Sequence, residues 1–141
     1  MKGGKRGRGS ENKTPIIGVV ERNGSVTAKV VVDTKSSTIQ PFVRSNVSIE
    51  AKVNTDTYVS YNGLKKMGYS HNKVNHGIKE WANGDCHTNT IEGFWSQLKR
   101  SIRGTYHFVS PKYLQNYVNE FAWRYNRRSY EQIFKCMIEN V

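Results

Sequence analysis

The sequence predicts an α/β domain in which helices pack on a sheet. Two segments rich in Val and Ile, 15–22 and 25–33, come first, and Asn23-Gly24 joins them. Asn-Gly between two such segments is the strongest short-range signal for a β-hairpin. A third predicted strand, 48–54, runs into Thr55-Asp56-Thr57, and the later part of the chain has helical spacing of its apolar residues. Strands followed by helices that bury one face against them define a layered α/β class.

Length and charge indicate one domain with a polyanionic partner. The chain has 141 residues, enough to bury a core, and its 22 Lys and Arg against 11 Asp and Glu give a net charge of +11. The cations are spread along the chain and aromatics make up 11% of it, a combination that favours nucleic acid over a membrane surface. Cys86 and Cys136 provide neither a disulfide framework nor a four-ligand zinc site. With no 18-residue apolar run, we expect a cytoplasmic protein without a membrane partner.

The first residues differ in composition from the rest. Residues 1–14 are basic and Gly-rich, which predicts an arm or surface loop ahead of a core over 15–141. Lys5, Arg6 and Arg8 are candidate phosphate contacts, although a disordered tail explains this composition equally well.

The spacing of apolar residues predicts four helices in addition to the one over residues 87–103. They cover 37–46, 58–67 closed by Gly68, 111–127 and 130–138, with a short strand or turn near Val74. The sheet is expected to be buried on much of both faces. The buried face of the 111–127 helix is predicted to consist of Tyr113, Leu114, Tyr117, Val118, Phe121, Trp123 and Tyr125. We expect His71 and His76 to be ordinary loop histidines, because no acid or Cys stands at a suitable ligand spacing.

Residues 87–103 form a predicted amphipathic helix with one acid on its polar face. The apolar stripe consists of Ile91, Phe94, Trp95, Leu98 and Ile102. The opposite face consists of Asn89, Glu92, Ser96, Lys99 and Arg103. Thr88 or Thr90 is suited to cap the start, and Gly104 to end the helix after Arg103. Periodicity alone does not separate a functional face from an ordinary mixture of surface charges.

Asp56 is the other candidate acid. It lies at the carboxyl end of a predicted strand, where open α/β sheets place ligands and catalytic groups. An alternative role is to cap the helix predicted at Tyr58, since Asp is a favoured N-cap residue.

Several stretches together resemble a known family. They read KRGRGS (5–10), PIIGVVER (15–22), TDTYVSYNGL (55–64), HTNTIEGFWSQLKRSIRGTYHFVSPKYL (87–114) and EFAWRYNRR (120–128). In these stretches the chain resembles the ISXO-like group of bacterial insertion-sequence transposases, which are DDE-type enzymes. The resemblance implies a ribonuclease H-like mixed sheet flanked by helices. It also implies DNA recombination by metal-dependent cleavage and strand transfer at the ends of the mobile element.

The resemblance assigns roles to particular residues. Asp56 matches the family's second acid, Glu92 the third, and Lys99 the basic partner on the same helix face. Asn89 and Ser96 flank Glu92 and are expected either to orient it or to contact the DNA. Arg100 and Arg103 join Lys99 as expected DNA contacts. In-line phosphoryl transfer uses two metal ions about 3.5–4 Å apart. Mg²⁺, or Mn²⁺ in its place, prefers the oxygen ligands that carboxylates provide.

One departure from the family pattern limits these expectations. The family's first catalytic Asp lies on a strand just before the Gly-rich basic loop, whereas this sequence begins at Met1 inside that loop. The resemblance therefore implies that the first strand and its Asp are missing, as in the carboxy-terminal part of a transposase. We expect little or no strand transfer by the chain alone, and an exposed edge on the sheet.

A second function remains open from the sequence. The charge is equally compatible with a non-catalytic basic DNA-binding protein, or with an inhibitor of transposition that occupies element ends or other transposase chains. Association with such chains as a homo-oligomer is an expectation under either function.

Overall fold

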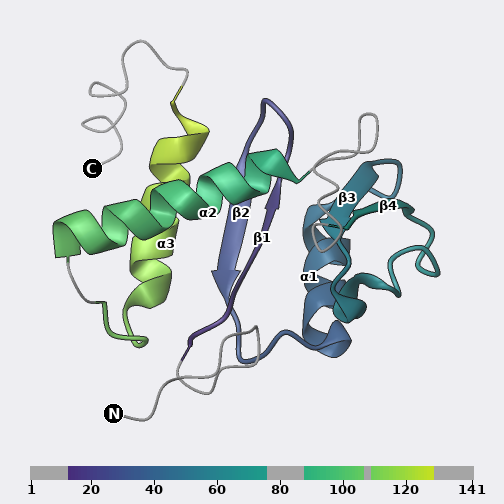
Figure 1. The fold of residues 1–141 in the computed structure, drawn as a ribbon, viewed down its shortest axis with the longest axis horizontal. Helices are drawn as coiled ribbons and strands as arrows, with labels where there is room; N and C mark the ends of the chain where they lie inside the picture. Colours follow the sequence, from purple (N-terminus) through teal and green to yellow (C-terminus); the bar gives the residue numbers. More distant parts are fainter. Residues whose placement is uncertain (1–12, 76–87, 107–108, 129–141) are drawn as a thin grey trace.

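The computed structural model describes residues 13–75, 88–106 and 109–128 (Figure 1). It is a mixed α/β structure with small sheets. Along the chain, its elements are β1 (Ile16–Val20), β2 (Val26–Val30), α1 (Ser36–Asn46), β3 (Lys52–Asp56), a 3₁₀ turn (Val59–Tyr61), β4 (Ser70–Val74), α2 (Asn89–Ser101), a π-helical turn (Ile102–Tyr106) and α3 (Leu114–Asn126). The predicted arm over 1–14 lies almost wholly outside the described residues, and the predicted helix over 130–138 lies entirely outside them.

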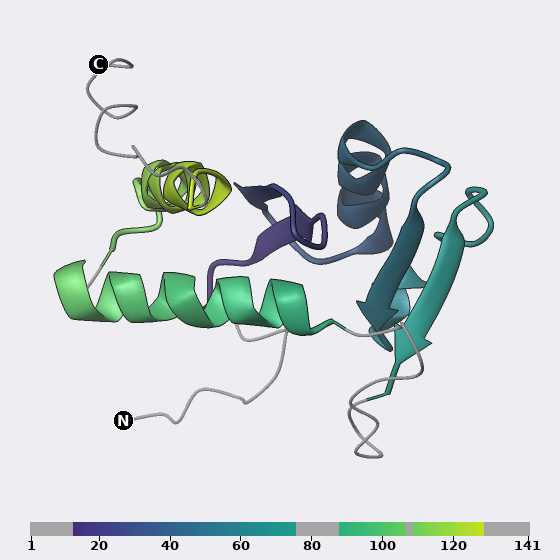
Figure 2. The ribbon, with the colours of Figure 1, turned by 90° about the horizontal axis from the view of Figure 1, so that it is seen from above.

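The strands form two pairs of opposite type. β1 and β2 are antiparallel, with Ile16 opposite Val30 and Val20 opposite Val26. β3 and β4 are parallel, although the short turn-rich segment between them contains no long helix. The edge of β1 away from β2 faces the edge of β3 away from β4 (Figures 1 and 2). Within the described residues the two pairs are separate two-stranded sheets.

The two faces of the hairpin differ in burial. Alternation along the strands puts Val26 and Ala28 on the face that packs against α2 and α3, and both are buried. Ile17 points the other way and is buried against α1. The expectation of a sheet buried on both faces is therefore right for β1. It is wrong for β2, because Thr27 and Lys29 are exposed.

The hairpin turn forms at Asn23-Gly24, as predicted, and the residue with positive φ is Asn23 and not Gly24. The φ of Asn23 is 59°, which is positive although Asn23 is not a glycine. The Gly24 amide donates to the Glu21 carbonyl at 2.9 Å, and the Glu21 amide donates to the Ser25 carbonyl at 2.9 Å. Asn tolerates the left-handed region better than most side chains, so the turn is accommodated by Asn23 and not by Gly24.

Two hydrophobic clusters hold the elements together. The first, here called the α1 core, joins α1 to β1 and to the segment before β4; its buried members are Ile17, Ile39, Val43, Leu64 and Tyr69. The second, here called the aromatic core, joins the hairpin to α2 and α3; its buried members are Val26, Ala28, Phe94, Leu98 and Val118. β1 contributes to both, since Ile16 and Val20 pack against the aromatic core.

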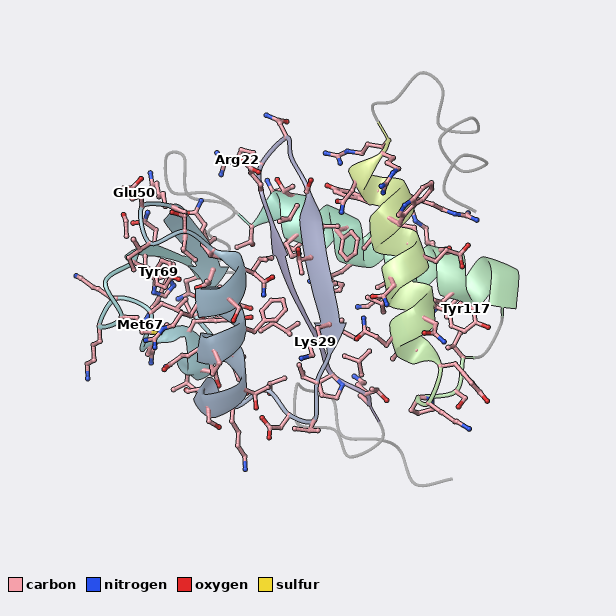
Figure 3. All side chains as sticks on the ribbon, turned by 180° about the vertical axis from the view of Figure 1, so that it is seen from behind. Arg22, Lys29, Glu50, Met67, Tyr69 and Tyr117 are labelled. Carbon is pink, nitrogen blue, oxygen red and sulfur yellow. The ribbon has the colours of Figure 1, made fainter. Side chains whose placement is uncertain are left out.

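The outer edge of β2 is covered by amide side chains of α3. Asn126 accepts the Val26 amide at 2.7 Å and donates to the Val26 carbonyl at 3.0 Å. Gln115 accepts the Val30 amide at 2.7 Å. Figure 3 shows α3 lying beside β2, the strand that carries Lys29. These bonds occupy groups that would otherwise be open to pairing with another chain.

Three helix predictions differ from the structure: one helix is absent and two have different ends. The predicted helix over 58–67 is a 3₁₀ turn followed by further turns to Gly68, whose φ is 101°. Asn62-Gly63 disfavours a regular helix there. The predicted helix over 111–127 begins three residues later, at Leu114. α2 ends at Ser101, and the π-helical turn then runs through Gly104, which therefore does not end the helix.

Three of the residues expected on the buried face of α3, Tyr113, Tyr117 and Trp123, lie outside the aromatic core. Tyr113 precedes the helix and is 50% exposed. The Trp123 ring stacks with the guanidinium of Arg127, 4.1 Å from the ring centroid, and lies outside the aromatic core. Trp95 and Phe121 do pack in that core, as expected. No helix in the described parts of the chain combines the length and apolarity that a bilayer-spanning segment needs.

Candidate metal and DNA site

Asp56 is the last residue of β3, as the sequence predicts for a candidate ligand. Its side chain is partly buried, and its Oδ1 accepts the backbone N–H of Tyr58 at 3.0 Å. This bond forms a local Asx-type turn that leads into the 3₁₀ turn. Asp56 is also a candidate cap for a helix at Tyr58, and it does accept that backbone N–H, although a 3₁₀ turn follows in place of an α-helix. The same bond fixes the carboxylate at the end of the strand.

A polar contact from β4 stabilises the same strand end. The Thr55 hydroxyl donates to the carbonyl of Asp56 at 2.7 Å and lies 2.7 Å from Nε2 of His71. Because the hydroxyl proton is used on the carbonyl, Nε2 of His71 acts as the donor. Burial lowers the pKa of His71, and the nearby Lys73 charge lowers it further, so the imidazole is neutral at pH 7. The expectation of a loop histidine is therefore wrong: His71 lies in β4 and pairs with β3.

The predicted division of α2 into two faces is confirmed. Phe94 and Leu98 are 0% and 3% exposed and lie in the aromatic core. The exposed side chains on the other side are Asn89, Glu92, Ser96, Lys99, Arg100 and Arg103. α2 thus presents one carboxylate in its first turn and a run of cations near its end. The acid lies near the positive end of the helix dipole and the cations near its negative end, so both interactions are favourable.

Glu92 is held by the residue that precedes the helix. Thr88 occupies the N-cap position, and its hydroxyl donates to Oε1 of Glu92 at 2.9 Å. The Glu92 amide also donates to the Thr88 carbonyl, at 3.1 Å. Of the two predicted caps, Thr88 has the right position, but its side chain makes no capping bond to the backbone.

The fold brings together the elements that carry the two acids. In both ribbon views the carboxyl end of β3 lies next to the first turn of α2 (Figures 1 and 2). Lys99, Arg100 and Arg103 lie further along α2, toward its far end. Lys5, Arg6 and Arg8 lie outside the described residues. Within residues 13–75, 88–106 and 109–128, no three His, Cys, Asp or Glu side chains gather into a metal site.

Asp33, which lies three residues after the end of β2, has a structural role. It accepts the Thr38 hydroxyl at 2.6 Å and the Lys35 amide at 3.0 Å. These bonds order the chain at the start of α1, and they lower the pKa of Asp33, with the Thr38 bond contributing most.

Comparison with known proteins identifies the family. The sequence profile of the ISXO2-like transposase domain matches residues 1–126. Over 97 residues the chain is 31% identical to an uncharacterized transposase-like protein of Haemophilus influenzae, a match that covers 69% of this chain and 77% of that protein. No solved structure gives a significant match. The chain belongs to the ISXO2-like transposase family.

Proposed function

We propose that this chain is a DNA transposase domain of an insertion sequence, in which Asp56 and Glu92 hold divalent metal for cleavage and strand transfer of element ends. The observation that carries the proposal is the placement of both acids. Asp56 ends β3 and Glu92 lies in the first turn of α2, and these two element ends are neighbours (Figure 2). Family membership supports the reaction class.

The donor chemistry fits Mg²⁺, or Mn²⁺ in its place. Mg²⁺ is usually bound by one or two carboxylates, together with water and substrate phosphate oxygens. Asp56 and Glu92 would provide these carboxylates. The buried Oδ1 of Asn54 has no hydrogen-bond partner, and Asn54 lies two residues before Asp56 on the same face of β3. A hard oxygen without a partner beside the proposed ligand is compatible with a hydrated cation nearby.

The protein's own part in the reaction is to bind and position DNA. A bound metal pair would activate the attacking water or 3′-hydroxyl and stabilise the leaving oxygen. Lys99 lies two turns from Glu92 on the same exposed face, where its ammonium would contact the phosphate at the bond being cut. Arg100 and Arg103 would extend that contact along the backbone, while Asn89 and Ser96 flank the acid.

We further propose a ribonuclease H-like arrangement of the sheets. The edges of β1 and β3 that face each other would both pair with one added strand, giving a mixed sheet with antiparallel and parallel parts. In this proposal the arm residues Lys5, Arg6 and Arg8 add phosphate contacts. A second transposase chain is the expected protein partner, and the cytoplasm the expected location.

The metal assignment is tested by titrating the full chain with Mn²⁺ and following the paramagnetic broadening of amide signals. Broadening should centre on the end of β3 and the start of α2, because both ligands lie there. Asp56→Asn and Glu92→Gln should each weaken binding at least about tenfold, since each removes a charged ligand. Glu50→Gln removes an exposed carboxylate from the turn between α1 and β3 and should leave binding unchanged.

The same variants separate the two candidate functions. With element-end DNA, a catalytic domain should bind more tightly when Mg²⁺ is present, and this gain should disappear in Asp56→Asn. Salt-sensitive binding that is identical with and without Mg²⁺, and identical in both variants, would favour the non-catalytic DNA-binding protein. Mn²⁺ broadening spread evenly over all exposed acids would contradict the metal assignment.

A further inference from the structure

We propose that Thr88 is a positioning residue that holds the Glu92 carboxylate ready for a divalent cation. The inference rests on the proposed function of Glu92 as a metal ligand. It assigns a role to a neutral side chain that lies just outside the helix and acts through Glu92.

Two hydrogen bonds connect Thr88 to Glu92. The Thr88 hydroxyl donates to Oε1 of Glu92 at 2.9 Å, and the Thr88 carbonyl accepts the Glu92 amide at 3.1 Å. The first bond fixes one carboxylate oxygen, and the second fixes the backbone from which that side chain extends. Residues four apart lie on the same side of a helix, so both bonds form without distortion.

The hydroxyl of Thr88 is not used in the way an N-cap hydroxyl normally is. A Thr at the N-cap typically adopts an extended backbone and bonds its side chain to an amide two or three residues on. Thr88 has φ −111° and ψ 15°, and it makes no side-chain cap bond. Its hydroxyl goes to the carboxylate instead, so loss of that hydroxyl should affect the carboxylate more than the helix.

Burial gives the contact its rigidity. Thr88 is 7% exposed, whereas Glu92 is exposed, and fixing an exposed side chain in one rotamer costs conformational entropy. A buried donor therefore anchors an exposed acid. Ordering the acid before the cation arrives removes part of the entropic cost of binding. Residues that hydrogen-bond a metal ligand in this way usually change metal affinity by about 10–100-fold when they are mutated.

The experiment compares Mn²⁺ affinity of the full chain across three threonine variants. Thr88→Val keeps the shape but loses the hydroxyl and should weaken Mn²⁺ binding about tenfold. Thr88→Ser keeps the hydroxyl and should restore binding to near the wild-type level. Thr90→Val is the matched control, because it makes the same substitution two residues further along and leaves the Thr88–Glu92 bond in place. Its affinity should stay at the wild-type level.

A second measurement does not depend on how the variants fold. In a Mg²⁺ titration of the wild-type chain, the carboxyl carbon of Glu92 and the methyl of Thr88 should shift together with one apparent Kd. The methyl of Thr90 should not follow them. Independent titration of Thr88 and Glu92 would overturn the inference.

The two proposals fail in different ways. If Thr88→Val binds Mn²⁺ as tightly as wild type while Glu92→Gln is weakened, the role of Thr88 is wrong and the ligand assignment stands. If Glu92→Gln and Asp56→Asn both bind as wild type, the ligand assignment is wrong and the inference falls with it.

Discussion

The two acids of the candidate site are held by regions of different chemistry. Glu92 lies on a helix anchored by the aromatic core, where the Phe94 ring lies 5.0 Å from Trp95, 5.5 Å from Phe121 and 5.2 Å from Tyr125, centroid to centroid. Asp56 lies at the end of a strand that packs on the α1 core, which is mainly aliphatic at its buried centre and has aromatic residues around it. Aromatic packing anchors the helix that carries Glu92, whereas hydrogen bonds order the chain around Asp56.

Hydrogen bonds link the residues that follow Asp56 to Thr34. The Tyr58 hydroxyl lies 2.9 Å from the Thr34 hydroxyl, and the Ser60 hydroxyl donates to the Thr34 carbonyl at 2.6 Å. At the opposite end of β3, the Tyr69 hydroxyl donates to the Val47 carbonyl at 2.9 Å. Hydrogen bonds are directional, whereas apolar packing is not. The bonds around Asp56 therefore fix the orientation of its neighbours, but they stabilise the fold less than apolar burial would.

The geometry of the site depends on β1, because this strand packs on both cores. Ile17 belongs to the α1 core, while Ile16 and Val20 pack on the aromatic core. A displacement of α2 relative to β1 would therefore move Glu92 while Asp56 stays with β3.

The largest expected effect is the loss of the Phe94 ring. Phe94 is 0% exposed, and Phe94→Ala should lower the free energy of unfolding by about 3–5 kcal/mol through lost burial and the cavity left behind. Chemical denaturation followed by circular dichroism measures the change. Leu64→Ala, equally buried in the α1 core, is the matched comparison and should cost less, since it removes fewer buried atoms and no ring contacts. An equal or greater loss with Leu64→Ala would contradict the ranking of the two regions.

Gly18→Ala tests the contact between β1 and α2. A Cβ at Gly18 would lie 2.8 Å from Cζ2 and 2.9 Å from Cη2 of Trp95, so the indole must shift, and we expect α2, which carries it, to shift with it. We expect a loss of about 1–3 kcal/mol in the free energy of unfolding. Because that shift moves Glu92, weaker Mn²⁺ binding should accompany it.

Gly93→Ala provides the control on α2 itself. A Cβ at Gly93 meets nothing within 4 Å, and the residue lies inside the helix. This change should stabilise the chain by about 0.5–1 kcal/mol through helix propensity and a less flexible unfolded chain. Equal stabilities for Gly18→Ala and Gly93→Ala would show that the Gly18–Trp95 contact does not constrain the helix.

The sequence predicts elements better where periodicity is strong and contacts are local. Both faces of α2 and the hairpin over Asn23-Gly24 follow from spacing and turn chemistry. The strand predicted over 48–54 is shifted to Lys52–Asp56, although Asp56 does lie at its carboxyl end. The helix predicted over 58–67 is wrong because Asp56 and Tyr58 form a local turn and Asn62-Gly63 disfavours continuation. Periodicity is insensitive to such side-chain to backbone bonds.

Contacts between distant parts of the chain are the part that sequence patterns do not reveal. Gln115 and Asn126 cover the edge of β2 across 85 and 100 positions. His71 reaches Thr55 only because β3 and β4 pair in parallel. In the candidate site, the residue types and their faces are readable from the sequence. The bond from Thr88 to Glu92 is different, because an N-cap Thr is expected to bond the backbone.

The smallest expected effect is a pH dependence that arises at the start of α1, in the region that polar contacts organise. The bonds from Thr38 and Lys35 lower the pKa of Asp33 below its ordinary value of 3.8, so the folded state favours the ionised carboxylate. That stabilisation is fully present above pH 3.8. It is lost as the pH falls from 3.8 through the lowered folded value, because the unfolded chain takes up the proton first. Asp33→Asn should remove this part of the pH dependence, and Thr38→Val should reduce it. Unfolding curves between pH 3 and 5, with the exposed Glu120→Gln as the control, measure the difference. If the Asp33→Asn curve stays parallel to that of the wild type across this range, the carboxylate makes no favourable contact in the folded state, and α1 depends on its apolar face alone.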